Sequence, residues 1–210
     1  MGTHTGTHVD ALCHASLAGR LFGDVDASDS LSGGRFKHHG IDTLQPIFTR
    51  GVLLDLAALI EAPAVPAGRP ITVDALEEAC ARQGVDVTEG DAVLFRMGRP
   101  TPQFVDIDRP EHLVAGVPGP DIGAARWLAE RGVRIAGSDT IAFEWVPPGR
   151  GTANLPVHTL FLVQKGIPIM ELLNLEELAA TGVHEFLFVA VPLNIMGATG
   201  SPIRPLALLL

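Results

Sequence analysis

The chain of 210 residues has few cysteines, only Cys13 and Cys80. Two thiols cannot build the framework of several disulfides that holds many small secreted proteins together, so a reducing compartment fits better. The chain also lacks a run of about 20 apolar residues, the length that a helix needs to span a bilayer. The apolar segment 205–210 is far too short, and the start carries no signal-peptide pattern. We therefore expect a cytoplasmic protein with no membrane partner.

Clusters of basic residues are also missing. The chain has 15 Lys and Arg against 24 Asp and Glu, a net charge of −9. Because nucleic-acid backbones are bound by concentrated cationic surfaces, we expect no nucleic-acid partner. Hydrophobic residues make up 47% and charged residues 19%, which is a globular composition. A chain of this length fits one domain and can bury roughly 70% of its unfolded surface. We expect a single domain over residues 1–210.

Apolar runs and helical patterns alternate along the chain. The runs predict strands at 51–56, 92–97, 133–136, 167–170 and 185–192. Helices are predicted at 120–131, 158–165 and 175–180, and another begins at a capping Asp74 and ends at Gly84. The first fifty residues, with weak periodicity, are expected to form loops around a site. This alternation favours a layered α/β architecture.

Three histidines and an aspartate lie within the first fourteen residues, as His4, His8, Asp10 and His14. Imidazole and carboxylate are ligands of catalytic divalent metals. The glycine and β-branched residues between them favour an extended or looping backbone over a helix. In an extended segment His8 and Asp10 point to the same face, about 6.7 Å apart at their Cα atoms. A positive φ at Gly6 would let His4 turn back toward His8.

This spacing predicts a particular chemistry. Three ligands leave coordination positions open for water and substrate, and a divalent ion lowers the pKa of bound water to around 7. His14 is close to the ligands and has an ordinary pKa near neutrality, which suits proton transfer. Two alternatives stay open: polar residues at a loose N-terminus, or a structural metal site whose removal would unfold the chain.

The segment from His4 to His14 resembles the H-x-G-T-H-x-D-x-P-x-H signature of the cyclase family of metal-dependent hydrolases, which includes bacterial kynurenine formamidases and isatin hydrolases. Leu12 stands where the family usually has proline. The similarity continues in segments 50–55, 90–96, 137–140, 156–158, 192–197 and 200–204. The resemblance implies a compact α/β domain with a curved, barrel-like β-sheet flanked by helices, assembled as a homodimer or a larger homo-oligomer.

The resemblance also implies a ligand set. His4, His8 and Asp10 would hold a first Zn²⁺ or Mn²⁺, and His158 and Glu171 would complete a second site that Asp10 bridges in the two-metal members. Other relatives use one ion. The spacing from His158 to Glu171 is one residue longer than in the formamidases. Independently of the resemblance, a carboxylate at the end of the apolar run 167–170 is costly unless it is paired, which supports Glu171 as a ligand.

By the same resemblance, His14 is the proton-transfer residue. The predicted function is a divalent-metal hydrolase that opens a small-molecule amide, either an aryl formamide or a cyclic amide such as an isatin-like ring; a lactone is the alternative substrate. The rival prediction is a non-catalytic family member that binds metal and assembles without turnover. Relatives carry several dozen residues before the motif, which here begins three residues after Met1, so we expect an N-terminally truncated member.

The remaining polar and aromatic residues favour structural interpretations. Cys13 is expected to be a buried small residue, because adjacent residues such as Cys13 and His14 diverge in extended structure. Phe143 and Trp145 could stack on an aromatic substrate, but packing is the commoner role. The segment 197–201 resembles a phosphate loop only weakly, since no lysine follows. Exposed loops or surface positions are expected for the other histidines: His38, His39, His112 and His184.

Overall fold

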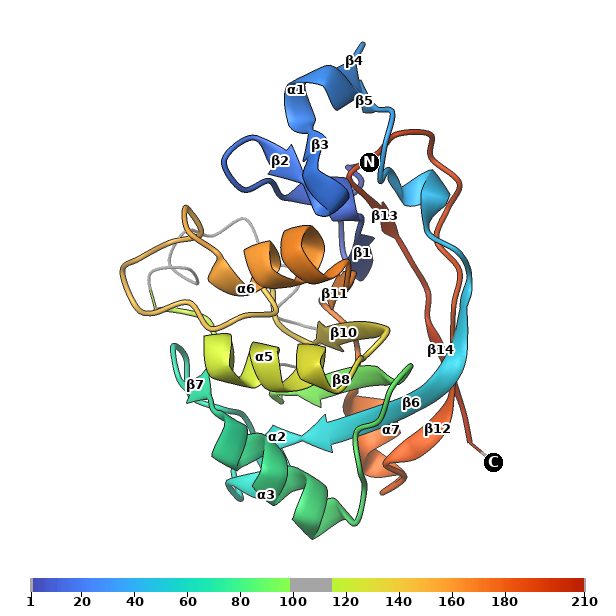
Figure 1. Cartoon of the computed structure of the whole chain (residues 1–210). Helices are drawn as coiled ribbons and strands as arrows, with labels where there is room; N and C mark the ends of the chain where they lie inside the picture. The colour runs from blue at the N-terminus through green and yellow to red at the C-terminus, as the bar shows by residue number, and fades with distance from the viewer. Residues whose placement is uncertain (1, 99–114, 210) are drawn as a thin grey trace.

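A curved sheet organises the part of the chain that the computed structural model describes, residues 2–98 and 115–209 (Figure 1). Eight strands of these residues form it, in the order β13-β1-β11-β10-β8-β6-β12-β14. In that order the strands span Gly200–Pro202, His8–Asp10, Ile169–Glu171, Ile135–Ser138, Ala92–Arg96, Ile47–Asp55, Glu185–Ala190 and Leu206–Leu208. The central strands β11, β10, β8 and β6 run parallel, and antiparallel strands flank them. The predicted α/β fold with a curved sheet is confirmed.

The helices α3 (Val73–Gln83), α5 (Ile122–Glu130) and α6 (Pro156–His158), which continues into η5 (Thr159–Lys165), pack on one face of the sheet (Figure 1). Val52 and Leu54 of β6 point into this core. Leu53 points into a second core on the other face. Continuous apolar runs are the pattern of strands that are covered on both faces, which is why these strands were visible in the sequence.

None of the helices in the described part of the chain is both long and apolar enough to cross a membrane. Short elements complete this part of the chain. They are η1 (Leu12–His14), β2 (Arg20–Leu21), η2 (Phe22–Asp24), β3 (Val25–Asp26), α1 (Ala27–Ser30), β4 (Leu31–Ser32), β5 (Arg35–Phe36), η3 (Ile41–Thr43), α2 (Leu56–Leu59), β7 (Pro70–Ile71), β9 (Gly119–Pro120) and α7 (Glu176–Ala180).

Element ends differ from the prediction in two instructive places. The helix α3 ends as predicted at Gly84, which has a φ of 67°, but the hydroxyl of Thr72 caps its start, not Asp74. Thr72 has the extended backbone of a cap residue, whereas Asp74 already lies in the first helical turn. The strand β6 starts earlier than predicted, at Ile47, and the last residue of the predicted run, Leu56, begins α2.

The strand β1 is the main departure from the loops predicted for the first fifty residues. It has only three residues, yet it lies inside the sheet between β11 and β13. Both neighbours come from the last quarter of the chain, and both pair with β1 in antiparallel register. The fold therefore places the histidine-rich start of the chain at the C-terminal end of β11.

Candidate metal centre

Alternation along β1 sends two of the predicted ligands to one side of the sheet. Val9 is buried in the second core, so His8 and Asp10 point to the opposite face, as an extended segment predicts. In the antiparallel register, His8 lies opposite Glu171 of β11, while Val9 lies opposite Met170. Residues directly opposite each other project to the same side, so Glu171 joins His8 and Asp10.

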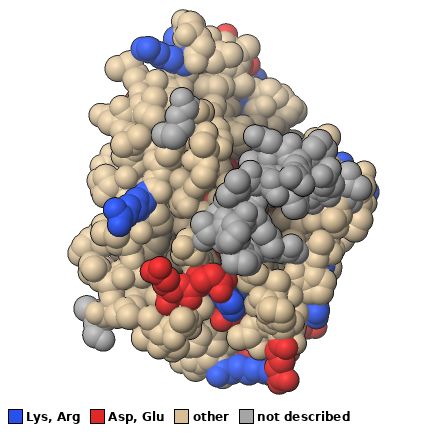
Figure 2. Space-filling model, turned by 180° about the vertical axis from the view of Figure 1, so that it is seen from behind, with Lys and Arg blue, Asp and Glu red and all other residues tan. Residues whose placement is uncertain are grey.

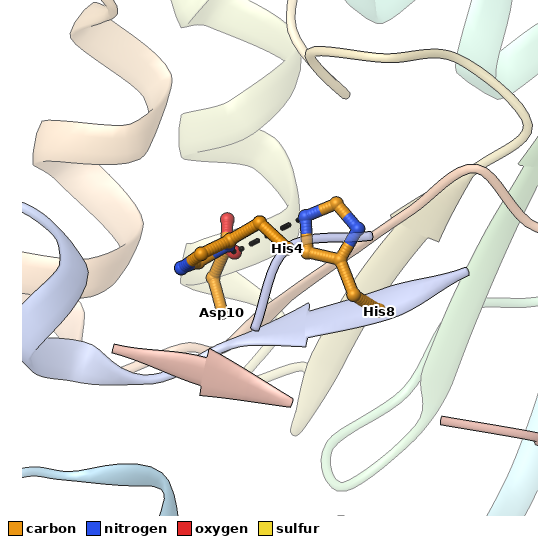
Figure 3. A group of neighbouring side chains, drawn as sticks. All are labelled: His4, His8 and Asp10. Atoms are coloured by element: carbon orange, nitrogen blue, oxygen red, sulfur yellow. Dashed lines mark ion pairs between the residues drawn. The ribbon is translucent and has the colours of Figure 1, made fainter. Parts of the chain in front are cut away.

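His4 reaches this group through the turn that precedes β1 (Figure 3). Gly6 has a φ of 64°, as the sequence predicted for a chain that turns back. The Nδ1 atom of His4 lies 2.8 Å from Oδ1 of Asp10, and Nε2 of His8 lies 3.5 Å from the same oxygen. His8 Nε2 is also 3.5 Å from Oε2 of Glu171.

His158 enters from the helix above the sheet. Its Nε2 atom lies 3.7 Å from Oδ2 of Asp10 and 3.3 Å from Oε1 of Glu171. Two groups can therefore hold a cation, His4–His8–Asp10 and Asp10–His158–Glu171, and within each group the ligand atoms lie within 4.8 Å of one another. Asp10 belongs to both, which is the bridging position that the resemblance implies.

The environment of Asp10 indicates whether a cation fits this centre. The residue is 1% exposed, and neither carboxylate oxygen accepts a well-aligned hydrogen bond from the described residues, although imidazoles stand close by. A buried carboxylate without hydrogen bonds is costly. A divalent cation would satisfy both oxygens, and a set of imidazoles and carboxylates suits zinc or manganese. The residues present fit a divalent metal.

The same packing shifts the pKa values of the group. Burial raises the pKa of the Glu171 carboxyl to about 7. Burial also favours the neutral form of His158, but the carboxylates of Asp10, Glu144 and Glu171 outweigh it and raise the pKa of His158 well above its ordinary value. Burial would raise the pKa of Asp10 too, yet the imidazoles of His158 and His4 hold that pKa below its ordinary value. In the absence of a metal, protons on Glu171 and His158 thus offset the negative charge of the buried carboxylates. A bound cation would otherwise offset that charge.

His14 lies beside the candidate ligands, at the end of η1, and its side chain is exposed. The centroid of its ring is 4.3 Å from that of His4 and 6.3 Å from that of His158. Loss of surrounding water lowers the pKa of His14, which favours a neutral ring that can accept a proton near neutral pH. The structure therefore brings together all six residues that the sequence singled out.

Two residues that sequence reasoning missed contact the outer nitrogens of the ligands. Oε1 of Glu144 lies 2.7 Å from Nδ1 of His158, and Oγ1 of Thr199 lies 2.8 Å from Nε2 of His4. No local pattern marks Glu144. The glycine-rich segment 197–201 was a signal for Thr199, but it suggested a phosphate loop; the structure instead places it beside β1, where β13 begins.

The other described histidines are not part of the two ligand groups. His38 is exposed and His39 is half-buried, and neither belongs to the two ligand groups. His184 was predicted at the surface; it is half-buried instead, because its ring contacts the Gln83 side chain between α3 and the start of β12. His112 lies outside the described residues.

The structural interpretations of Cys13 and the aromatic residues are confirmed. Cys13 is buried, and that burial raises the pKa of its thiol to about 11, so it is a poor nucleophile. Phe143 is fully buried, with its ring centroid 5.8 Å from those of Phe95 and Phe161. Trp145 donates its indole N–H to a backbone carbonyl. Both aromatic residues therefore pack within the protein.

Comparisons with known proteins identify a family model, a relative and solved structures that are similar to this chain. The family model described as "Putative cyclase" matches residues 1–145. The isatin hydrolase of Roseibium aggregatum is 29% identical over 210 residues, a match that covers 99% of this chain and 72% of the relative. The crystal structure of a novel cyclase superposes with a TM-score of 0.86 at 31% identity, over 99% of this chain and 70% of that one. Isatin hydrolase A from Labrenzia aggregata gives a TM-score of 0.72 at 25% identity, over 100% and 74%. This chain belongs to the cyclase family.

Proposed function

We propose that this chain is a divalent-metal-dependent hydrolase that opens an amide bond in a small molecule, either an aryl formamide or a cyclic amide such as an isatin-like ring. The observation that carries the proposal is the shared, buried Asp10, whose oxygens lack aligned hydrogen bonds and face imidazoles from two directions. The similarity to isatin hydrolase supports the cyclic amide. A divalent ion, when bound, would lower the pKa of a water and polarise the amide carbonyl.

The residues around the proposed metal position have different roles in the proposed reaction. Asp10 holds the two ligand groups together, and His8 and His158 direct their Nε2 atoms at the carboxylates between them. His14 is the exposed imidazole next to this buried group, so it can meet both water and substrate. In the proposed reaction, His14 takes a proton from the attacking water and gives one to the leaving nitrogen. Water is thereby added across the carbon–nitrogen bond.

Replacement of His14 tests the mechanism. We expect His14→Ala to lower kcat on N-formyl aryl amines or isatin by about 10²- to 10⁴-fold, the usual contribution of a general acid–base. Metal per chain, measured by mass spectrometry, should stay close to that of the wild type, because His14 belongs to neither ligand group. His38→Ala is the matched control, since His38 is an exposed histidine outside those groups. Wild-type turnover in His14→Ala would remove this residue from the mechanism.

The same preparations separate the alternatives. Turnover of lactones in place of amides would move the substrate class to carbon–oxygen bonds. Stoichiometric metal without turnover on either class would indicate a family member that binds metal and does not catalyse. Unfolding by a chelator, with no exchangeable water on the ion, would indicate a structural site.

A further inference from the structure

Groups outside the metal centre set the tautomers of two candidate ligands, His8 and His158. A neutral imidazole binds a cation through one nitrogen only when its proton is on the other nitrogen. For His8, Nδ1 lies 2.8 Å from the backbone oxygen of Gly6. A carbonyl can only accept, so Nδ1 carries the proton and Nε2 is free toward Asp10 and Glu171.

The other two imidazoles have different partners. The Thr199 hydroxyl next to Nε2 of His4 can donate or accept, so it leaves the tautomer of His4 open. An ionised Glu144 can only accept, and its Oε1 faces Nδ1 of His158 at 2.7 Å. In the neutral ring that binds a cation, Nε2 of His158 would thereby be free toward Glu171 and Asp10.

Glu144 is tied to the same helix that carries His158. Its Oε1 also accepts the backbone N–H of His158 at 2.8 Å, and its Oε2 accepts that of Val157 at 3.1 Å. The residue before the helix, Leu155, offers no side-chain cap, so Glu144 satisfies these first N–H groups from a loop. One buried carboxylate, 1% exposed, therefore fixes both the start of the helix and the ring of His158.

The loop around Glu144 is held on both sides. Phe143 has a φ of 51°, an uncommon conformation for a bulky residue, and its buried ring packs between Phe95 and Phe161. Trp145 is anchored through its backbone and indole N–H groups. A Cβ at Gly119 would lie 2.1 Å from the carbonyl oxygen of Phe143, so the loop packs directly on bare backbone. Strain of this kind persists where packing over-determines the backbone, often at functional sites.

We propose that Glu144 is a positioning residue of the metal centre: its carboxylate accepts the Nδ1 proton of His158 and so aims the Nε2 lone pair at the space between Asp10 and Glu171. The proposal rests on the proposed metal-dependent function. It assigns to Glu144 no contact with substrate or metal. Its consequence is that neutralising Glu144 weakens metal binding without removing any ligand.

The experiment compares Glu144→Gln with the wild type. We expect its affinity for Zn²⁺ and Mn²⁺, measured by competition with a chromophoric chelator, to fall by about 10- to 100-fold, as for other partners of metal-bound histidines. In the zinc-loaded wild type, proton NMR should show the Nδ1–H of His158 far downfield, since it bonds to a carboxylate. That signal should move upfield in Glu144→Gln, while the Nδ1–H of His8, bonded to a backbone carbonyl, stays in place.

Two further variants control for helix capping and folding. Asp121→Ala removes a cap on α5, where Oδ1 of Asp121 accepts the N–H of Ala124 at 2.8 Å, and it should leave metal affinity unchanged. Glu144→Asp keeps the charge and should recover part of the affinity even if Glu144→Gln folds poorly. An affinity within about twofold of the wild type in Glu144→Gln, or a His158 that binds zinc through Nδ1, overturns the proposal. A wild-type chain that binds neither ion overturns the proposed function itself, which is a distinct result.

Discussion

At the scale of single residues, Gly200 makes room for His4. A Cβ at this position would lie 2.6 Å from Cε1 of His4 and 2.8 Å from the carbonyl oxygen of Val9. Gly200 pairs with Asp10 across the β1–β13 ladder, and its φ is not positive, so space and not backbone conformation excludes a side chain. The ring of His4 occupies the place where a side chain would stand.

We expect Gly200→Ala to displace His4 and weaken metal binding. The added methyl group should also lower the free energy of unfolding by about 1–3 kcal/mol, the usual range for overpacking. Chelator competition measures the first effect and denaturant unfolding the second. Unchanged metal affinity would show that His4 is not a ligand in this position.

The pKa of Glu171 predicts how pH acts on the metal-free protein. Because its folded value of about 7 exceeds the ordinary 4.5, this carboxyl contributes stability that is fully present below about pH 4.5 and is lost as pH rises through about 7. Over the same window the ionised form becomes available to a cation, so metal affinity should increase with pH.

Denaturant unfolding in the presence of a chelator checks this prediction. The difference in unfolding free energy between the wild type and Glu171→Gln should shift against the wild type as pH rises from about 4.5 to about 7, because the variant cannot ionise. Taking the difference removes the contributions of groups far from Glu171, whereas those of His158 and Asp10, which interact with it, remain. A difference that does not change with pH would contradict the burial of a proton on Glu171.

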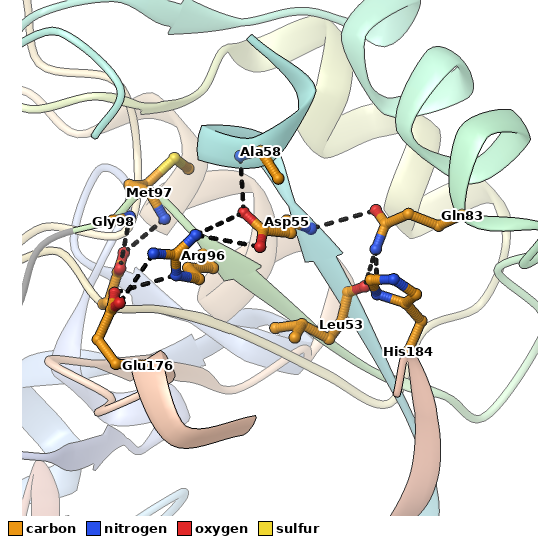
Figure 4. A network of polar contacts seen from close by, with 10 residues as sticks. Leu53, Asp55, Ala58, Gln83, Arg96, Met97, Gly98, Glu176 and His184 are labelled. Carbon is orange, nitrogen blue, oxygen red and sulfur yellow. Dashed lines mark hydrogen bonds and ion pairs between the residues drawn. The ribbon is translucent and has the colours of Figure 1, made fainter. Parts of the chain in front are cut away.

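At the scale of elements, Arg96 joins two strands and a helix on the side of the sheet shown in Figure 4. Its guanidinium contacts both oxygens of Asp55 on β6, at 2.9 and 3.0 Å, and both oxygens of Glu176 on α7, at 3.0 and 2.8 Å. The side chains of Arg96 and Asp55 are 15% and 10% exposed. Asp55 also caps α2 through the N–H of Ala58. Among the described residues, Arg96 is the cation that pairs with the Asp55 carboxylate.

We expect Arg96→Met to lower the free energy of unfolding by about 3 kcal/mol, because it leaves the buried carboxylate of Asp55 without its partner. Arg82→Met is the matched control. Its pair with Glu78 is within one helix, and the two side chains are 54% and 52% exposed, so the loss should stay under about 1 kcal/mol. Equal effects of the two substitutions in denaturant unfolding would contradict a structural role for the Arg96 network.

The elements that the sequence predicted well are those whose burial repeats locally. Apolar runs located β6, β8 and β12, and Gly84 located the end of α3. The inner strand β1 was not predicted, because three residues are too few to show a hydrophobic period. Its position in the sheet also depends on pairing with strands that are distant in the sequence. The helix predicted at 158–165 is confirmed by α6 and η5, but the π-helical form of η5 was not predicted, since its wider turns are not encoded in helical spacing.

The residues of the candidate site also divide into those that the sequence indicated and those that it did not. The ligand-type residues were visible because their side-chain chemistry is unusual at that spacing, and the extended segment correctly placed His8 and Asp10 on one face. Glu144 and Thr199 were not visible, because their function depends on a single contact to a ligand that is far away in the sequence or on another element. Carboxylates and hydroxyls of this kind are too common for their position alone to be informative.

At the scale of the whole molecule, the absence of a nucleic-acid partner stays a prediction. On the face shown in Figure 2, one group of acidic side chains lies below the centre of the view and others lie near the edges, while Lys and Arg are scattered over the tan surface. Assembly into a homodimer or larger homo-oligomer stays a prediction, which light scattering in solution would measure, and a cytoplasmic location stays one as well.

The position of β1 has a consequence for the order in which the protein can be built. The hydrogen bond between His4 and Thr199 joins residues 195 positions apart, and β1 pairs with β11 and β13. On the ribosome, His4 and β1 must wait, unpaired, until β11 and β13 have emerged. Closing such long loops slows folding, so assembly of the candidate metal centre is expected to be a late step of folding. Metal binding at the proposed centre should therefore follow the pairing of β1 with β11 and β13.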